Sequence, residues 1–121
     1  MIDEAISAYD EAWNAPDAAT RSSLLRQGMT PGAELIDPQA GRMRGYDEIS
    51  ARIRGFGSRF PGARVSITSR VDEHNGFARY SWTIVDAAGK ALLRGIDVVE
   101  RADDQRLKRV VMFFGDLTSE D

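Results

Sequence analysis

The spacing of apolar residues changes from helical to alternating near Pro61. Before this proline, apolar side chains recur every three or four residues, a spacing that places them on one face of a helix. The first such series is Ile2, Ile6, Tyr9 and Trp13. After the proline, apolar and polar residues alternate, which is typical of a half-buried strand. A chain with helices first and strands afterwards favours an α+β fold, with the helices packed on one face of a bent sheet.

Caps and prolines set the bounds of the helical part. Asp3 and Asp17 can each cap a helix, because a short acceptor side chain satisfies the free N–H groups of the first turn. Pro16 ends the first helix, and Asp37 is extended because it precedes a proline. The sequence predicts helices at about 3–15, 17–28 and 46–60, a turn at 30–32, a short strand near 33–36 and a loop that contains Gly41 and Gly45.

A four-stranded antiparallel meander is predicted to follow, with strands at about 64–74, 77–86, 91–101 and 106–114. Asn75-Gly76 is a strong signal for a two-residue hairpin turn. This turn sets the register of the first two strands, because side chains on paired strands alternate between the two faces together. The predicted pairs are His74 with Phe77, Val71 with Tyr80, and Ser69 with Trp82.

Turns of four residues in the next two hairpins place Asp97 on the apolar face of the sheet. The predicted pairs are then Tyr80 with Asp97, Trp82 with Gly95, Asp97 with Val110, and Gly95 with Met112. A carboxylate on an apolar face must be hydrogen-bonded, protonated or directed into a cavity. The alternative is a register that is off by one residue, which would direct Asp97 to solvent but leave Ile96 and Val98 in need of cover.

Four short segments resemble those of one known family. Residues 9–17 resemble a first helix in which a tyrosine stands five residues before an Asn-Ala-Gly-Asp stretch, and residues 34–38 resemble a Glu-Asp-Pro segment. Residues 95–99 resemble a Pro-Ile-Asp strand, and residues 113–116 resemble a terminal Leu-Phe-Gly-Glu. The family that these four segments resemble is that of the ketosteroid isomerases. The chain as a whole resembles the nuclear transport factor 2-like superfamily, which also contains SnoaL-like polyketide cyclases and limonene epoxide hydrolases.

The resemblance implies a cone-shaped fold and an enzyme that uses neither a cofactor nor a metal. It implies that Asp37 is the general base, and that Tyr9 and a protonated Asp97 donate hydrogen bonds to the substrate oxygen. The implied substrate is a small hydrophobic carbonyl compound in which a proton moves between two carbon atoms. The residues expected to line the substrate pocket are Trp13, Phe56, Phe60, Tyr80, Trp82, Val110, Met112 and Phe114.

Departures from these families keep other functions open. Leu25 and Ile53 stand where some isomerases have tyrosines that hold the catalytic tyrosine, and Gly95 and Met112 stand where the epoxide hydrolases have an arginine and an aspartate. One alternative is a non-catalytic small-molecule-binding or dimeric interaction domain of the same fold. Another is a polyketide cyclase-like or epoxide hydrolase-like enzyme. Aromatic side chains that fill the cone and leave no cavity are a further alternative.

Composition excludes several classes of site and partner. A length of 121 residues is that of one domain, here residues 1–121. The chain has no cysteine and a single histidine, His74, so disulfides, thiolate metal sites and His-rich zinc sites are excluded. A net charge of −3 argues against nucleic-acid binding. No apolar run approaches the roughly 20 residues of a membrane span, and residues 1–4 do not resemble a signal peptide, so we expect a cytoplasmic protein.

Arginine is the main cation, with fourteen arginines and two lysines, and eight of the arginines lie between Arg42 and Arg79. This enrichment has two interpretations. The arginines are either an ordinary solvated surface or a patch for an anionic partner.

The face of the sheet that the helices leave uncovered is predicted to be apolar. It carries Leu92, Ile96, Val98, Val85, Val111 and Phe113. An exposed apolar patch of this size is rare on a monomer. Pairing of two sheets about a two-fold axis would bury it, so a homodimer is expected.

Overall fold

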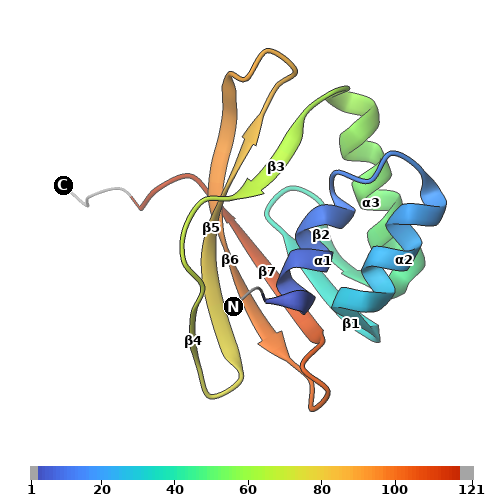
Figure 1. Cartoon of the computed structure of the whole chain (residues 1–121), viewed down its shortest axis with the longest axis vertical. Helices are drawn as coiled ribbons and strands as arrows, with labels where there is room; N and C mark the ends of the chain where they lie inside the picture. The colour runs from blue at the N-terminus through green and yellow to red at the C-terminus, as the bar shows by residue number, and fades with distance from the viewer. Residues whose placement is uncertain (1–2, 118–121) are drawn as a thin grey trace.

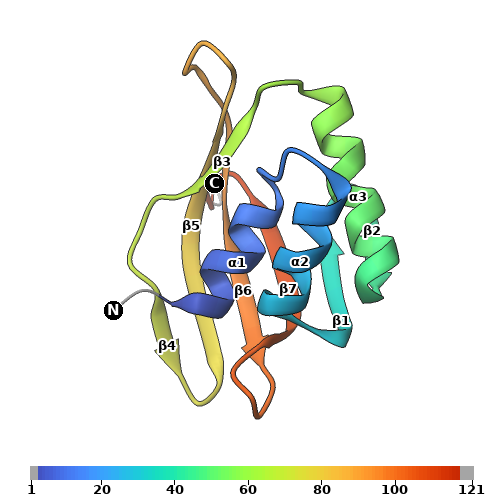
Figure 2. The same ribbon diagram turned by 45° about the vertical axis from the view of Figure 1, so that its right-hand side comes forward.

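Three helices lie on one side of a curved seven-stranded sheet in the part of the chain that the computed structural model describes, residues 3–117 (Figures 1 and 2). The helices are α1 (Glu4–Ala12), α2 (Ala18–Gly28) and α3 (Gly45–Arg59). The strands are β1 (Met29–Asp37), β2 (Gly41–Arg44), β3 (Arg64–Ile67), β4 (Asp72–His74), β5 (Phe77–Val85), β6 (Ala91–Arg101) and β7 (Leu107–Phe114). The predicted α+β class and the helices on one face of a bent sheet are confirmed.

The first two helices begin at the predicted caps. The Asp3 side chain accepts a hydrogen bond from the backbone of Ile6, and that of Asp17 accepts one from Thr20. Ile2 lies outside the described residues. Helix α1 ends at Ala12 rather than near residue 15, because the side chain of Asn14 instead pairs with both backbone groups of Val65, at 2.8 Å each. This pairing ties the connection between α1 and α2 to β3.

Strand β1 is longer than predicted. The expected turn at 30–32 lies inside β1, and the expected loop at Gly41 forms β2. The cause is a parallel pairing of β1 with β7, a long-range contact that local turn signals do not reveal. The register of this pair shifts between Met29 and Glu34, and a shift of this kind accommodates Pro31, which has no N–H to donate.

The sheet order is β2-β1-β7-β6-β5-β3, with β4 also paired to β5. All the pairs are antiparallel except β1 with β7, so the predicted meander is confirmed, with its first strand divided into β3 and β4.

Three of the predicted strand pairs are confirmed and four are wrong. The confirmed pairs are His74 with Phe77, Tyr80 with Asp97, and Trp82 with Gly95. Trp82 pairs with Ile67 instead of Ser69, because residues 68–71 leave the ladder and the Ser69 hydroxyl accepts the backbone N–H of Ser81. The expected partner of Tyr80, Val71, is likewise outside the ladder.

The third hairpin is longer than predicted. Asp97 pairs with Met112 rather than Val110, and Gly95 pairs with Phe114 rather than Met112. Residues 102–106 separate the paired Arg101 and Leu107, and the register shifts again next to Glu100. Each displacement amounts to two residues, so no side chain changes face. Asp97 therefore stays on the side of the sheet that faces the helices.

Two glycines allow close packing next to the site. A Cβ atom on Gly28 would lie 2.8 Å from the backbone of Ala5 and of Tyr9, so this glycine lets α2 approach α1. A Cβ atom on Gly95 would lie 2.2 Å from the carbonyl oxygen of Phe113 and 2.4 Å from the ring of Trp82. Gly95 therefore makes room for the Trp82 ring to lie across β6.

Candidate functional site

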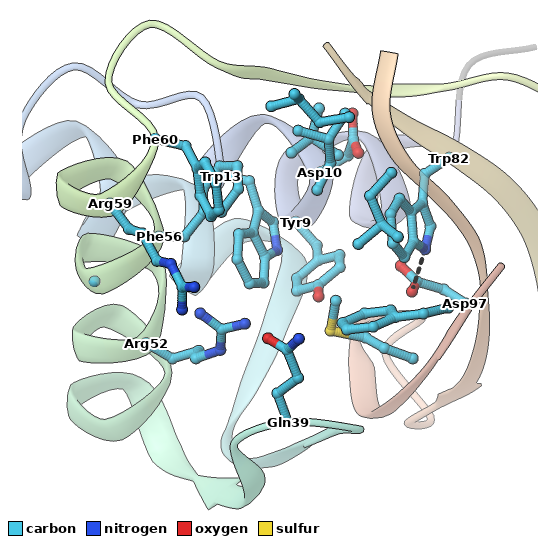
Figure 3. A pocket seen from close by; sticks show the side chains of 17 residues that line it. Tyr9, Asp10, Trp13, Gln39, Arg52, Phe56, Arg59, Phe60, Trp82 and Asp97 are labelled. Atoms are coloured by element: carbon cyan, nitrogen blue, oxygen red, sulfur yellow. Dashed lines mark hydrogen bonds between the residues drawn. The ribbon is translucent and has the colours of Figure 1, made fainter. Parts of the chain in front are cut away.

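A cavity of about 310 Å³ lies between α1, α3 and the inner face of the sheet (Figure 3). This volume is at the lower end of the range of about 300 to 1,000 Å³ that small-molecule sites occupy. Its wall is largely aromatic and aliphatic. Six of the residues expected in the pocket line it, namely Trp13, Phe56, Phe60, Trp82, Met112 and Phe114.

Tyr80 and Val110, which were also expected in the pocket, are buried in the core and do not line the cavity. Leu92, predicted on the outer face of the sheet, does line it together with its neighbour Leu93. The reason is an irregularity in the β5–β6 ladder: Ile84 pairs with Leu93 and Val85 with Ala91, which leaves Leu92 as an extra residue.

Asp97 and Tyr9 form the polar inner end of the cavity. Asp97 is only 4% exposed, and one of its carboxylate oxygens accepts a hydrogen bond of 2.8 Å from Nε1 of Trp82. Burial raises the pKa of Asp97 to about 7, although the hydrogen bond from Trp82 acts to lower it. A carboxyl group with such a pKa is partly protonated at neutral pH and can then donate a hydrogen bond.

The hydroxyl groups of Tyr9 and Tyr80 are buried and have no hydrogen-bond partner among the described residues. Burial, and then the charge of Asp97, raise the pKa of Tyr9 well above its usual value, so this phenol stays protonated. Because Tyr9 lines the cavity and Tyr80 does not, Tyr9 is the one of the two that can donate to a bound molecule. A buried donor without an acceptor costs stability, and a ligand oxygen would remove that cost.

Asp10 is a second carboxyl group on the same cavity, and it was not predicted. It is 8% exposed, and its side chain makes no hydrogen bond with residues 3–117. Burial raises the pKa of Asp10 to about 7, helped by the charges of Glu11 and Asp97 and opposed by Arg64. A sequence signal existed, because Asp10 stands four residues after Ile6 and three before Trp13, on the same apolar face of the helix.

Asp37 lies at the end of β1, as predicted, but it does not line the cavity. Three hydrogen bonds hold its side chain in place. One carboxylate oxygen accepts the backbone N–H groups of Gln39 and Ala40 at 2.8 and 3.1 Å, and the other accepts Nε of Arg52 at 2.8 Å. The structure therefore brings Tyr9 and Asp97 to one cavity and leaves Asp37 behind Arg52.

Arg52, Arg59 and Gln39 lie at the side of the cavity away from Asp97 (Figure 3). None of the three was predicted. Arg52 stands three residues after Ile49 and four before Phe56, at the edge of the apolar stripe of α3, and Arg59 follows seven residues later on the same edge. The cavity therefore has an inner end with acidic and phenolic groups and an opposite side with two guanidinium groups.

Within residues 3–117, no group of three or more His, Asp or Glu side chains is placed to hold a metal ion. No helix in the same part of the chain has the length and hydropathy needed to span a membrane.

Solved structures of similar fold come from several bacteria. A protein from Agrobacterium tumefaciens str. C58, provisionally assigned as an isomerase of the SnoaL-like family, is 30% identical, with a TM-score of 0.85 over 92% of this chain and 94% of that one. A provisionally assigned SnoaL-like polyketide cyclase from Jannaschia sp. CCS1 is 18% identical, with a TM-score of 0.70 over 90% and 81% of the two chains.

A protein with a ketosteroid isomerase-like fold from Catenulispora acidiphila DSM 44928, solved in complex with trimethylamine, is 12% identical, with a TM-score of 0.75 over 95% of this chain and 88% of that one. No curated protein sequence matches this chain. The family model of the SnoaL-like domain matches residues 6–110. The chain therefore belongs to the SnoaL-like family, whose structures share the predicted α+β cone.

Proposed function

We propose that this protein is a cofactor-independent enzyme that moves a proton within a small hydrophobic carbonyl compound. Tyr9 and protonated Asp97 donate hydrogen bonds to the carbonyl oxygen, and Asp10 is the general base. The observation that carries the proposal is that an unpartnered buried hydroxyl and two buried carboxyl groups line one apolar cavity. Two donors directed at an oxygen stabilise the negative charge that develops on it when a neighbouring carbon loses a proton.

The base in this proposal is not the residue that the family resemblance implies. Asp37 is held by Arg52 and by two backbone N–H groups and does not line the cavity, whereas Asp10 lines it and has no such partners. A pKa of about 7 suits Asp10 to the role, because a base works best when its pKa is near the working pH. Arg64 favours the ionised form of Asp10, while Asp97 is the more deeply buried of the two.

The reaction can be followed on a β,γ-unsaturated ketone. The Asp10 carboxylate takes a proton from the carbon between the carbonyl and the double bond, and that C–H electron pair moves toward the carbonyl to form an enolate. Tyr9 and Asp97 hold the enolate oxygen. The Asp10 carboxyl then returns the proton to the γ-carbon, and the double bond moves into conjugation with the carbonyl. The first step also serves a cyclase, in which the enolate carbon attacks a second carbonyl of the same molecule.

The test is the isomerisation of cyclohex-3-enone to cyclohex-2-enone, followed by the absorbance of the conjugated product. Asp10→Asn is expected to lower kcat by roughly 10²-fold or more, the scale of a lost general base. Glu4→Gln is the matched control, because it removes an acid from an exposed position of the same helix that does not line the cavity, and it is expected to keep the activity.

Equal, background rates for the wild type and Asp10→Asn over a panel of such ketones would overturn the proposal and favour a non-catalytic binding domain. Loss of activity in Asp37→Asn combined with full activity in Asp10→Asn would return the role of base to Asp37. The second candidate, a binding domain, is supported by Leu25 and Ile53, which are buried where some isomerases have supporting tyrosines.

We also propose that the protein acts as a cytoplasmic homodimer, with the outer face of the sheet as the interface. The support is a cluster of apolar side chains on that face, in which Ile96 pairs with Phe113 and Val98 pairs with Val111.

A further inference from the structure

Two guanidinium groups of α3 face the cavity with little to neutralise them. Arg52 uses Nε to bind Asp37 at 2.8 Å, and its two terminal nitrogens donate to no group within residues 3–117. Arg59 forms no hydrogen bond or ion pair with the described residues and rests against Phe60, 5.4 Å from the centre of the ring. Figure 3 shows both side chains projecting from α3 toward the cavity, near Gln39.

The position of Arg52 is fixed. Its ion pair with Asp37 and its contact with Trp13, 5.7 Å from the ring centre, hold the guanidinium over the cavity wall. The free edge of the guanidinium therefore has a defined direction, as a recognition group requires, because a donor fork that is already ordered loses little entropy when it binds.

Eight arginines outside the cavity form ion pairs with carboxylates, whereas Arg21, Arg26, Arg54 and Arg70 form none within residues 3–117. Four of the eight show this: Arg79 binds Asp72, Arg101 binds Asp3 and Glu73, Arg106 binds Asp104, and Arg109 binds Glu34 and Glu100. At the cavity, Asp37 pairs with Arg52 alone, and Arg59, which is exposed, has no carboxylate partner among the described residues. On this side of the cavity, away from Asp10 and Asp97, the charges of Arg52, Arg59 and Asp37 sum to +1, and a carboxylate bound there would balance that charge.

We propose that the substrate of this cavity carries a carboxylate, which binds between Arg52 and Arg59 while its carbonyl oxygen reaches Tyr9 and Asp97 at the inner end. This inference deepens the proposed function and rests on it for the position of the carbonyl group. The substrate class is then a small hydrophobic keto acid. A carboxylate matches the paired donors of a guanidinium edge, and a dianion such as a phosphate monoester would exceed the single charge available.

The two ends of the cavity also fix the direction in which such a substrate enters. Asp10 and Asp97 line the inner end and disfavour a carboxylate there, while Arg52 and Arg59 attract it to the opposite side. Repulsion from the wrong end and attraction at the right end act together, so one orientation is selected. The carbonyl group is thereby directed toward the donors.

Binding of two probes of the same shape tests the inference. Cinnamate and cinnamamide differ in charge and not in size, and titration calorimetry gives the affinity of the purified protein for each. The wild type is expected to bind cinnamate more tightly, by roughly tenfold or more, the scale of a charge-assisted hydrogen bond. Arg59→Gln is expected to abolish this preference with the affinity for cinnamamide unchanged.

Arg54→Gln is the matched control, because Arg54 is an exposed arginine of the same helix that does not line this cavity. It is expected to keep the preference for cinnamate. Equal affinities of the wild type for the acid and the amide, or binding of neither, would overturn the inference, and so would an equal loss of preference in Arg54→Gln and Arg59→Gln. The proposed function fails by a different result, an unchanged rate in Asp10→Asn, which does not depend on either probe.

Discussion

The Tyr9 hydroxyl is expected to have opposite effects on stability and on catalysis. It lowers the stability of the folded protein, and it raises the rate of the proposed reaction. It is buried and has no acceptor among the described residues. Tyr9→Phe is therefore expected to leave the free energy of unfolding unchanged or to raise it. The same change is expected to lower kcat by about 10²-fold, the scale of one lost oxyanion donor. Urea denaturation and ketone isomerisation on the same samples measure the two effects.

Tyr80→Phe is the control for this prediction, because the Tyr80 hydroxyl is equally buried and unpartnered but does not line the cavity. Tyr80→Phe leaves the hydrogen bond from Trp82 to Asp97 in place, so Asp97 is expected to keep its role as a donor. A loss of activity as large in Tyr80→Phe as in Tyr9→Phe would contradict the role given to Tyr9.

The two cavity carboxyl groups predict how stability depends on pH. Burial raises the pKa of both Asp10 and Asp97 from 3.8 to about 7. In the unfolded chain these groups lose their protons near pH 4, whereas in the folded protein they keep them to about pH 7. The folded state thus binds more protons between these values, and the free energy of unfolding falls as the pH rises from about 4 to about 7.

Chemical denaturation at pH 5 and pH 8 measures this slope. Asp10→Asn and Asp97→Asn are each expected to make it shallower and to be more stable than the wild type at pH 8, because neither asparagine must be buried with a charge. The catalytic rate is expected to pass through a maximum near pH 7, since Asp10 must be ionised and Asp97 protonated. An identical pH slope in the wild type and both variants would contradict this assignment.

The sequence predicted Asp97 and missed Asp10, although both are carboxyl groups on apolar faces. Asp97 could be placed because alternation along a strand survives a register error of two residues, and both register errors were of that size. Asp10 could have been placed from helical spacing, because it stands four residues after Ile6 and three before Trp13 on the apolar face of α1. The surroundings of Asp37 could not be predicted, because Arg52 is held against it by the packing of α3 on β1.

At the scale of elements, the close packing of β5 against β6 depends on glycine at position 95, which has no side chain. A methyl group at Gly95 would lie 2.4 Å from the Trp82 ring and 2.2 Å from the carbonyl oxygen of Phe113. Gly95→Ala must therefore displace Trp82, whose Nε1 donates to Asp97. We expect a loss of stability of about 1 to 3 kcal/mol, together with a change in tryptophan fluorescence.

Gly57→Ala in α3 is the matched control, because a Cβ atom there meets nothing within 4 Å. Alanine favours a helix more than glycine does, so this variant is expected to be more stable by roughly 0.5 to 1 kcal/mol. Denaturant midpoints compare the two variants. Equal stability of Gly95→Ala and the wild type would show that the contact between Trp82 and β6 is not tight.

The elements that the sequence predicted well are those defined by neighbouring residues. Capping by Asp3 and Asp17 and the Asn75-Gly76 hairpin are local, and all three are observed. The parallel pairing of β1 with β7 joins distant parts of the chain and was not predicted. The extra residue at Leu92 was missed for a related reason, since an irregularity in a ladder depends on how both strands twist.

At the scale of the whole molecule, the two faces of the sheet differ in what covers them. The helices cover one face (Figure 1), and the cavity lies between α1, α3 and that face. On the other face Ile96 is 40% exposed and its cross-strand partner Phe113 is 55% exposed. A charged group centred on Glu34 and Arg109 lies across the neighbouring strands β1 and β7. Pairing through the apolar part of this face would leave the cavity open to solvent.

We therefore expect light scattering at tens of micromolar to give twice the 13.4 kDa mass of one chain. Phe113→Glu places a charge in the middle of the apolar patch, where a second copy would have to desolvate it, so the variant is expected to have the mass of a single chain. Leu117→Glu is the control, since Leu117 is fully exposed beyond the end of β7, and it is expected to remain a dimer. A wild-type mass of one chain at this concentration would contradict the predicted interface, and a Phe113→Glu dimer would place the interface elsewhere on the surface.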